Sequence, residues 1–290
     1  MSCAKTSYNG QPLCLTTRHG KDKALTCPFA AGLGLQLQVY PGDTDQLGTF
    51  SGEIARQGDA LSTARRKVML GLEATGLRYG LASEASFGPH PAAAMLAVGQ
   101  ELLLFIDREQ GMEMLEQRLE LRTNYSQRRL GRDDDPSPWL EQVGFPRHGV
   151  IARPAAANLQ EDHEAPLFKG LRSAAELEQA LMICRAADPN AEVWLESDMR
   201  AHMNPTRMAS LRRLGFALVR RLRTPCPSCG GPGWGQIDAE AGLPCSWCGE
   251  PTALTRSEIW ACPSCGERRS LPRRDGLIKA DPGQCSWCNP

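Results

Sequence analysis

Paired cysteines near the C-terminal end constrain the fold of this chain more than any other feature of its sequence. Eight of its twelve cysteines follow position 225. They form four Cys-x2-Cys pairs: Cys226 and Cys229, Cys245 and Cys248, Cys262 and Cys265, and Cys285 and Cys288. Fifteen residues separate the first two pairs and nineteen separate the last two, and both intervals are typical of four-cysteine zinc sites. The spacing, and the repeated texts CPSCG and CSWC, predict two successive sites in a duplicated module: the first two pairs form one and the last two form the other.

Four thiolates complete a tetrahedron around zinc and leave no position for water, so each predicted site is structural. The segment is rich in Gly and Pro and has little apolar periodicity, so zinc would supply folding energy that a small core cannot. Disulfides and a redox Cys-x2-Cys site are the alternatives, but regularly spaced cysteines in the cytosol are more typical of metal binding. We therefore expect a boundary near Thr224, between an α/β domain (residues 1–224) and tandem zinc ribbons (residues 225–290).

The remaining composition is that of an ordinary globular protein of about two domains. No apolar run approaches the ~18 residues of a membrane span, and the first residues lack the apolar core of a signal peptide. We therefore expect a cytoplasmic protein that has no membrane partner. The 33 basic residues balance the 33 acidic ones, and two zinc-bound cysteine sites would make the net charge negative. This balance argues against a protein that coats nucleic acid non-specifically.

Strand-like and helix-like segments alternate through the first 224 residues. Short apolar runs between Gly or Pro residues predict strands at 13–17, 35–40, 79–83, 101–107 and 193–196. Apolar residues at three- and four-residue steps predict helices at 59–75, 174–187 and 204–222. In the last of these, Asn204 is the expected N-cap and Pro205 the first helical residue. The alternation indicates an α/β fold with a mixed sheet and flanking helices.

One polar loop has the composition of a phosphate site. Thr16 and Thr17 end the strand predicted at 13–17, and Gly20 and Lys21 follow it and precede a helix-like stretch. Free backbone N–H groups at a helix start, together with hydroxyls and a lysine, are suited to phosphate. A plain turn is the alternative, since hydroxyl-Gly-Lys loops are common.

Carboxylates concentrate in two further loops. Residues 43–53 (DTDQLGTFSGE) place three carboxylates, Glu53 among them, before a predicted helix. Their oxygen atoms are hard ligands suited to Mg²⁺. The alternative is a solvated loop that caps the helix. Glu84 follows the strand predicted at 79–83, where α/β folds place ligand crevices, and it is the foremost functional candidate. His90 lies between two prolines and is either a ligand-binding or a structural side chain.

A second polar cluster follows the predicted strand at 193–196. Its candidate residues are Glu196, Asp198, Arg200 and Arg207. Two carboxylates and two arginines at a strand-to-helix junction are able to bind a metal and a phosphate. They are equally able to form a corner held by salt bridges.

These motifs carry a family resemblance. DTDQLGTFSGE at 43–53, GLASEASFGPHP at 80–91, ESDMRAHMNPTRM at 196–208 and the paired C-terminal zinc ribbons resemble a family of uncharacterised bacterial proteins, defined as a domain of unknown function. The resemblance covers nearly the whole chain. It implies no activity.

A second resemblance covers residues 16–88, which look like the first half of the non-canonical purine nucleoside triphosphate pyrophosphatases, the inosine and xanthosine triphosphatase type. That family has a Ser/Thr-x-Asn-x-x-Lys loop, matched here by Thr16 and Lys21 with Arg18 in the Asn place. An acidic residue and an Asn-Ala-x-x-Lys-Ala helix follow, matched by Glu53 and residues 63–68, with Thr replacing the Asn.

The pyrophosphatase resemblance implies a role for each candidate. Lys21 and Lys67 would neutralise triphosphate oxygens, and the catalytic carboxylates Glu53 and Glu84 would hold Mg²⁺. Together with His90, which lies beyond the resemblance and is named for its place between two prolines, the residues predicted to contact substrate or phosphate are Thr16, Thr17, Lys21, Lys67 and Ser86. The leading hypothesis is therefore a Mg²⁺-dependent nucleotide hydrolase with a structural zinc-ribbon tail.

The competing hypothesis is a zinc-ribbon module that binds RNA or a protein without catalysis. The helix at 204–223 carries six arginines, and no acidic residue lies between Arg207 and Thr224. Four tryptophans of the tail are able to stack on bases, although in so small a fold they more often pack against the metal knuckles.

Overall fold

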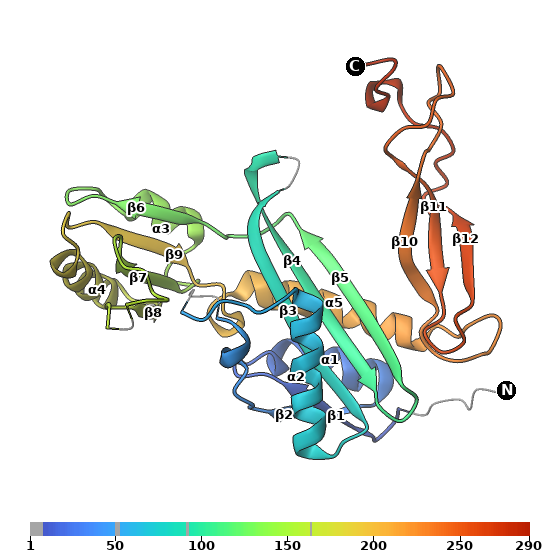
Figure 1. Ribbon diagram of the computed structural model, residues 1–290, viewed down its shortest axis with the longest axis horizontal. Helices are drawn as coiled ribbons and strands as arrows, with labels where there is room; N and C mark the ends of the chain where they lie inside the picture. Colours follow the sequence, from blue (N-terminus) through green and yellow to red (C-terminus); the bar gives the residue numbers. More distant parts are fainter. Residues whose placement is uncertain (1–7, 50–52, 91–92, 163) are drawn as a thin grey trace. The chain divides into compact units, whose positions relative to one another are not determined.

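A computed structural model of the chain describes residues 8–49, 53–90, 93–162 and 164–290 (Figure 1). The chain forms two compact units. The larger is Asn9–Leu218, and the smaller consists of Val219–Pro290 together with Tyr8. The division falls within the last long helix, whereas the sequence places the domain boundary near Thr224, just after that helix ends.

The larger unit contains a mixed five-stranded sheet in the order β2-β1-β3-β4-β5. Its strands are β1 (Pro12–Thr16), β2 (Gln36–Tyr40), β3 (Tyr79–His90), β4 (Ala93–Asp107) and β5 (Met112–Glu120). Strand β1 is parallel to β2 and β3, and β4 is antiparallel to both β3 and β5. Because β1 ends at Thr16 while β3 continues, the second half of β3 runs past the carboxyl end of β1.

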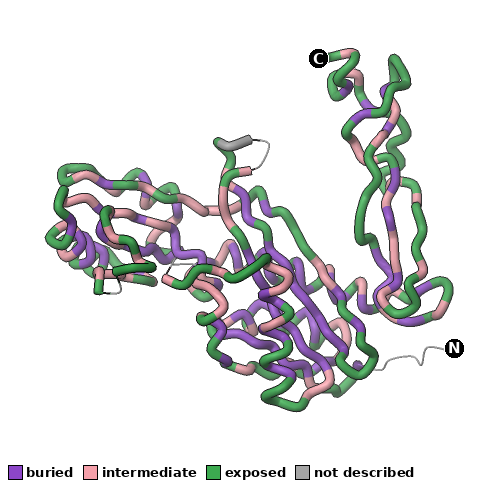
Figure 2. Tube along the Cα trace, in the orientation of Figure 1, coloured by how far each residue is buried: buried purple, intermediate pink, exposed green. Residues whose placement is uncertain are grey.

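Two helices connect these strands, α1 (Asp22–Leu33) and α2 (Ala60–Thr75). Helix α2 begins after Asp59, whose carboxylate accepts a 2.6 Å hydrogen bond from the Ser62 N–H group. Such a cap satisfies an N–H group that has no partner within the helix. Apolar residues of α2 at helical spacing pack against the sheet, where buried residues concentrate (Figure 2).

A second, antiparallel sheet of the larger unit has the order β6-β9-β7-β8. Its strands are β6 (Gln127–Leu130), β7 (Val150–Pro154), β8 (Phe168–Leu171) and β9 (Val193–Ser197), with α3 (Ser137–Val143) and α4 (Ala174–Ala187). Helix α4 starts at a capping box in which Ser173 and Glu176 exchange hydrogen bonds with each other's backbone N–H groups.

Helix α5 (Pro205–Arg223) follows the second sheet. The Asn204 side chain caps it by accepting a 3.0 Å hydrogen bond from the Arg207 N–H group, as the sequence predicts. Short 3-10 turns occur at η1 (Asp45–Leu47), η2 (Ala201–Met203) and η3 (Pro282–Gln284).

The smaller unit contains an antiparallel three-stranded sheet in the order β10-β11-β12. Its strands are β10 (Gly235–Ala241), β11 (Thr255–Ala261) and β12 (Arg268–Pro272). The cysteine pairs lie in the segments that precede, connect and follow these strands. The expected fold class, an α/β protein with a mixed sheet, flanking helices and C-terminal cysteine clusters, is confirmed.

The expected boundaries of two paired strands were wrong. The strand predicted at 101–107 is β4, which already begins at Ala93. The strand predicted at 79–83 continues to His90, because β4 pairs with it from Tyr79 to the end of the strand. Glu84 therefore lies within β3, opposite Leu102 of β4, and not after a strand end. It nevertheless lies beyond the carboxyl end of β1, the neighbour of β3 on the other side.

Candidate functional site

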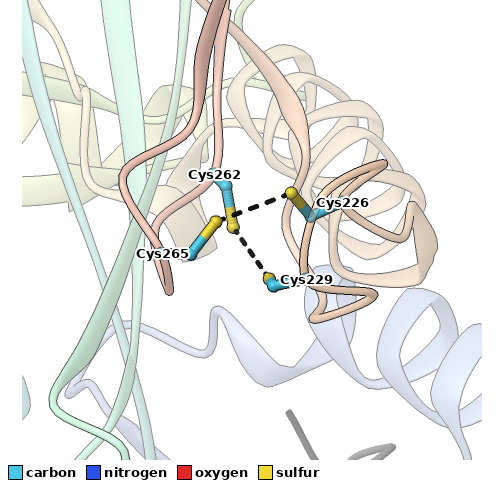
Figure 3. Close-up of side chains that lie close together, drawn as sticks. All are labelled: Cys226, Cys229, Cys262 and Cys265. Carbon is cyan, nitrogen blue, oxygen red and sulfur yellow. Dashed lines mark hydrogen bonds between the residues drawn. The ribbon is translucent and has the colours of Figure 1, made fainter. Parts of the chain in front are cut away.

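The C-terminal cysteines form two groups of four, but not the two groups that their spacing predicts. Within the described part of the chain, the first group is Cys226, Cys229, Cys262 and Cys265, and the second is Cys245, Cys248, Cys285 and Cys288. The sulfur atoms of each group all lie within 4.8 Å of one another, and Figure 3 shows the first group. The prediction of two successive sites was wrong, because the first pair combines with the third and the second with the fourth.

The three-stranded sheet explains this interleaving. Each of the first three cysteine pairs is followed by a strand, or by a strand and a long loop, that carries the chain to the other end of the sheet. The seven-residue strands β10 and β11 each span roughly 23 Å, at about 3.3 Å per residue. Consecutive pairs therefore lie too far apart to share an ion, whereas alternate pairs meet at the same end.

The sulfur spacing in both groups fits zinc. The sulfur atoms lie 3.8 Å apart in the pairs Cys226–Cys265 and Cys229–Cys262. In the second group, Cys245–Cys288 and Cys248–Cys285 are separated by 3.8 Å and 3.6 Å. Zn–S bonds of ~2.3 Å in a tetrahedron place the sulfurs about 3.8 Å apart. Two four-cysteine groups of this size fit two structural zinc ions.

Backbone N–H groups support the thiolates of these sites. The N–H groups of Ser228, Trp247 and Ser264 each donate to the first sulfur of their own cysteine pair at 3.4 Å. Each donor lies two residues after that cysteine, so the same tight turn is used in both groups. Hydrogen bonds to a thiolate favour its charged form, which is the form that binds zinc.

A cleft of about 140 Å³ lies in the larger unit, where β1 ends and β3 continues. Six cationic side chains line it: Arg18, Lys21, Arg56, Lys67, Lys169 and Arg200. Asp45 and Glu84 are the acidic residues among its described lining. Three carboxylates outside this lining, Asp43, Glu53 and Asp198, pair with Arg18, Lys169 and Arg200, so the cationic side chains exceed their acidic partners by one. This predominance of cations makes the cleft a candidate anion site.

Lys21 is the most deeply buried of these cations, with 5% of its surface exposed. Its Nζ donates a 2.9 Å hydrogen bond to the carbonyl oxygen of Ser83 on β3. Burial, with the nearby charges of Arg207 and Lys67, lowers the pKa of Lys21 to about 7. At neutral pH this ammonium group is therefore in balance with its uncharged form.

Glu84 is buried among these cations. Its carboxylate forms an ion pair with Lys67 of α2, and Arg56 lies 3.6 Å from it. Burial has the largest single influence and raises the pKa of Glu84, but Lys21, Lys67 and Arg56 together hold that pKa below its usual value. The Glu84 carboxylate is therefore an anion that already pairs with cationic side chains of the cleft.

The loop after β1 forms one wall of the cleft. Arg18 pairs with Asp43 at 2.8 Å and with Asp45 at 3.2 Å, and Thr17 accepts a hydrogen bond from the His19 N–H group. Burial, followed by the charge of Lys21, lowers the pKa of His19 to about 3, so its imidazole is neutral. The carboxylates of the 43–53 loop that the structure describes thus pair with cations, and residues 50–52 of this loop lie outside the described part.

The other residues predicted for this site have different positions. Glu53 binds Lys169 at 2.8 Å and is not part of the described cleft lining. Ser86 accepts a 2.9 Å hydrogen bond from Arg56, and His90 lies near the end of β3. The structure thus brings Lys21, Lys67 and Glu84 together with the buried Thr16 and Thr17, but places Glu53, Ser86 and His90 outside the lining.

The second polar cluster divides among three environments. Arg200 lines the cleft and is held by the buried Asp198 at 2.6 Å. Glu196 pairs with Arg153 at 3.0 Å. Arg207 is buried and bonded to Glu101 at 2.5 Å. The arrangement corresponds to the salt-bridged alternative, with Arg200 as the one member of the cluster in the described cleft lining.

The arginines of α5 are less available than their sequence suggests. Arg213 pairs with Glu120 of β5 at 3.1 Å, and Arg212 donates to the carbonyl oxygen of Lys23. With the buried Arg207, two of the six arginines are opposed by acids from distant strands. The acidic partners lie on strands distant in the sequence, so the sequence of the helix alone did not predict these ion pairs.

Sequence reasoning missed two residues of the cleft, Arg56 and Lys169. Arg56 lies in an irregular segment before α2, and its guanidinium also donates to the carbonyl oxygen of Ala85 at 2.5 Å. Lys169 lies in the four-residue strand β8. Neither residue belongs to a recognisable motif. Their positive charges join those of the other cleft residues only when distant segments of the chain come together.

The donor set of the cleft does not form a cage for a divalent cation. Outside the two cysteine groups, the described residues contain no cluster of three or more metal-ligating side chains. Asp45 and Glu84 each face cations. Mg²⁺ commonly binds through one or two carboxylates and substrate phosphates, so here it would have to enter with a phosphate ligand.

Comparisons with known proteins give one match. A family model described as a domain of unknown function (DUF6671) matches residues 67–290. No curated protein and no solved structure matches the chain. The matched region contains all eight C-terminal cysteines, together with Lys67, Glu84, Lys169 and Arg200 of the cleft. Among the described residues, no helix combines the length and the apolar character needed to span a membrane.

Proposed function

Because the chain belongs to the DUF6671 family, whose description assigns no activity, we propose its function from the cleft: the protein binds the phosphate groups of a nucleotide. The observation that carries this proposal is the convergence of six cationic side chains on one small cleft with two carboxylates. These side chains come from segments far apart in the sequence, so their proximity does not result from a local run of basic residues.

The dimensions and chemistry of the cleft support phosphate as the group bound. A volume of about 140 Å³ is several times the roughly 10–15 Å³ that a cavity needs to hold one water, which leaves room for a phosphate group. Arginine binds phosphate through two parallel hydrogen bonds, and Arg18, Arg56 and Arg200 line the cleft, where a phosphate would compete with the carboxylates that they already contact. The nucleoside part would lie outside this volume.

Binding would proceed by exchange of anions. In the structure, the carboxylate of Glu84 forms an ion pair with the ammonium group of Lys67. A phosphate carries more charge than a carboxylate, so it would take Lys67 and Lys21 as partners and release Glu84. The released carboxylate would then lie beside the bound phosphate.

The hydrolytic form of the proposal is a Mg²⁺-dependent nucleoside triphosphate pyrophosphatase. In this form Glu84 would join phosphate oxygens in holding Mg²⁺, or would position the attacking water. Glu53 would contribute only after leaving Lys169. When bound, Mg²⁺ would neutralise the charge that develops as pyrophosphate leaves.

Calorimetric titration with pyrophosphate and nucleoside triphosphates, with and without Mg²⁺, tests this proposal. Lys67→Gln should weaken binding at least about tenfold. Lys23→Gln is the matched control, because Lys23 is an exposed lysine of α1 outside the described cleft lining. Equal affinity of both variants, or no binding by the wild type, would refute phosphate binding. Pyrophosphate release that is abolished by Glu84→Gln would establish hydrolysis, and binding without turnover would restrict the protein to nucleotide sensing.

RNA or protein binding through α5 and the cysteine-rich unit is the second candidate function. Arg212, Arg220 and Arg223 are exposed on α5, which favours contact with a phosphate backbone. RNA affinity that falls steeply with salt, and that Arg220→Gln and Arg223→Gln reduce, would support it. Absence of binding to a single-stranded RNA oligomer at low salt would exclude the RNA form.

A further inference from the structure

The two cysteine groups differ at one position of the same knuckle turn. In the first group, the residue just before the second cysteine of each pair is Ser228 or Ser264. In the second group, the corresponding residue is Trp247 or Trp287. Ser228 and Trp247 make the same backbone contact, a 3.4 Å hydrogen bond from N–H to the first sulfur. The turn therefore forms with either side chain and does not require a tryptophan.

These two tryptophans are not used for packing. Trp247 and Trp287 are 79% and 75% exposed, whereas Trp234, beside the first group, is only 7% exposed. Trp234 packs with Cys226 and Cys262, as expected for a tryptophan that supports a metal knuckle. Large exposed aromatic residues in so small a unit do little for its stability, and tryptophan is enriched where proteins bind partners.

A third exposed apolar side chain lies close to the second group. Ala280 is paired with Cys245, and its N–H group donates to the carbonyl oxygen of Pro244 at 2.8 Å. Ile278, two residues earlier, is 78% exposed, and at about 3.3 Å per residue it lies within roughly 7 Å of Ala280 along the chain. Three large apolar side chains are thus exposed around one cysteine group.

The charge around the second group is negative. Nearby arginines are paired, Arg273 with Asp275 at 2.5 Å and Arg274 with Glu258 at 3.0 Å. Glu250 and Asp281 then outnumber Lys279 in the two loops that carry the group. Four thiolates around one Zn²⁺ add two further negative charges. This charge repels a phosphate backbone and attracts cations, which also bind the faces of exposed tryptophans.

We propose that Trp247, Trp287 and Ile278 form a docking surface for a basic, partly apolar peptide segment of a protein partner. Lysine or arginine side chains of that segment would contact the indole faces and the acidic surroundings, and its apolar residues would cover Ile278. The surface belongs to the smaller unit, so the proposal does not depend on phosphate binding in the cleft.

Selection from a displayed library of random twelve-residue peptides on the zinc-loaded full chain tests this proposal. The wild type should enrich peptides that combine positive charge with apolar residues. Trp247→Ser with Trp287→Ser, which reproduces the residues of the first group, should bind the enriched peptides at least about tenfold more weakly. The zinc content of this variant should equal that of the wild type.

A second variant keeps the test decisive if the first loses zinc. Glu250→Lys changes an exposed side chain outside the metal ligands and should weaken the same peptides several-fold. Enrichment of acidic peptides by the wild type would overturn the proposal. So would basic peptides that bind both variants as tightly as they bind the wild type. So would retention of a single-stranded uridine oligomer in place of peptides, or a dimer that the tryptophan substitutions abolish, since the occupant would then be RNA or a second copy of the chain.

Discussion

The sulfur atoms of Cys226 and Cys265 lie 3.8 Å apart, although the two residues are 39 positions apart in the sequence. Cys245 and Cys288 show the same relationship across 43 residues. Each zinc ion would therefore join segments on either side of a strand, and the two ions together would clamp both ends of the β10–β12 sheet. This sheet has few buried apolar residues, so the two metal sites replace its missing core.

Paired cysteine substitutions distinguish the interleaved arrangement from two successive sites. Cys226→Ser with Cys265→Ser damages only one group, so the chain should keep about one zinc ion. Cys226→Ser with Cys245→Ser damages both groups and should remove nearly all zinc. Zinc per chain, measured by mass spectrometry after dialysis against a weak chelator, checks this. Successive sites would give the opposite ranking of the two variants.

Removal of zinc should unfold the smaller unit and leave the larger one folded. Without zinc, no ion joins the four cysteines of each group, and zinc binding supplies folding energy in small metal domains. A strong chelator should therefore expose the segment from Val219 onward to protease, while Asn9–Leu218 stays resistant. The far-ultraviolet helix signal should change little. Loss of protection in both units at the same chelator concentration would contradict this expectation.

The parts of the fold that the sequence predicts best have local causes. Helix α4 matches its predicted range of 174–187 because apolar periodicity and the capping box at Ser173 both act within a few residues. Strand β3 was predicted too short because its outer half is partly exposed and loses the apolar pattern. That half is held by pairing with β4, which no local pattern in β3 encodes.

The same contrast applies to the sites. The sequence identifies all eight cysteines but not their pairing, since alternate pairs meet only through the path of the strands. Family resemblance named Lys21, Lys67 and Glu84, which the structure brings together. It also named Glu53, which binds Lys169, and it did not include Arg56. Ion pairs between distant segments decide where these side chains lie. Neither residue spacing nor family resemblance predicts such pairs.

Anion binding in the cleft should weaken as the pH rises from about 6 to 9. The pKa of Lys21 is lowered to about 7 from the ordinary value of a lysine, so its positive charge is present below that pH and is lost above it. Sulfate is a suitable probe, because it does not change its own charge in this range. Titration calorimetry of sulfate across this range should show affinity falling several-fold around neutral pH.

Lys21→Met is the control for this pH dependence. It removes the titrating group and should give weaker sulfate binding that varies little between pH 6 and 9. His19 should not contribute, because its pKa of about 3 lies below the range tested. A fall in affinity that persists unchanged in Lys21→Met would show that another group titrates in the cleft.

The buried ion pair between Arg207 and Glu101 should be essential for the stability of the larger unit. Both side chains are almost inaccessible, and Arg207 also donates to the carbonyl oxygen of Met199 at 2.5 Å. Arg207→Met leaves the Glu101 carboxylate buried without this cation and should cost about 3–5 kcal/mol. The matched control is Arg65→Met, since Arg65 pairs with Glu113 on the surface at 2.6 Å, where loss of a pair costs less than about 1 kcal/mol.

Urea unfolding followed by tryptophan fluorescence measures both free energies of unfolding. Glu101→Leu combined with Arg207→Met should recover part of the loss, because no unpaired charge remains buried. If Arg207→Met cost no more than Arg65→Met, Arg207 would not be a structural residue and would return to consideration as a ligand-binding residue. Since Arg207 lies outside the described cleft lining, we expect its effect on stability to exceed any direct effect on phosphate affinity.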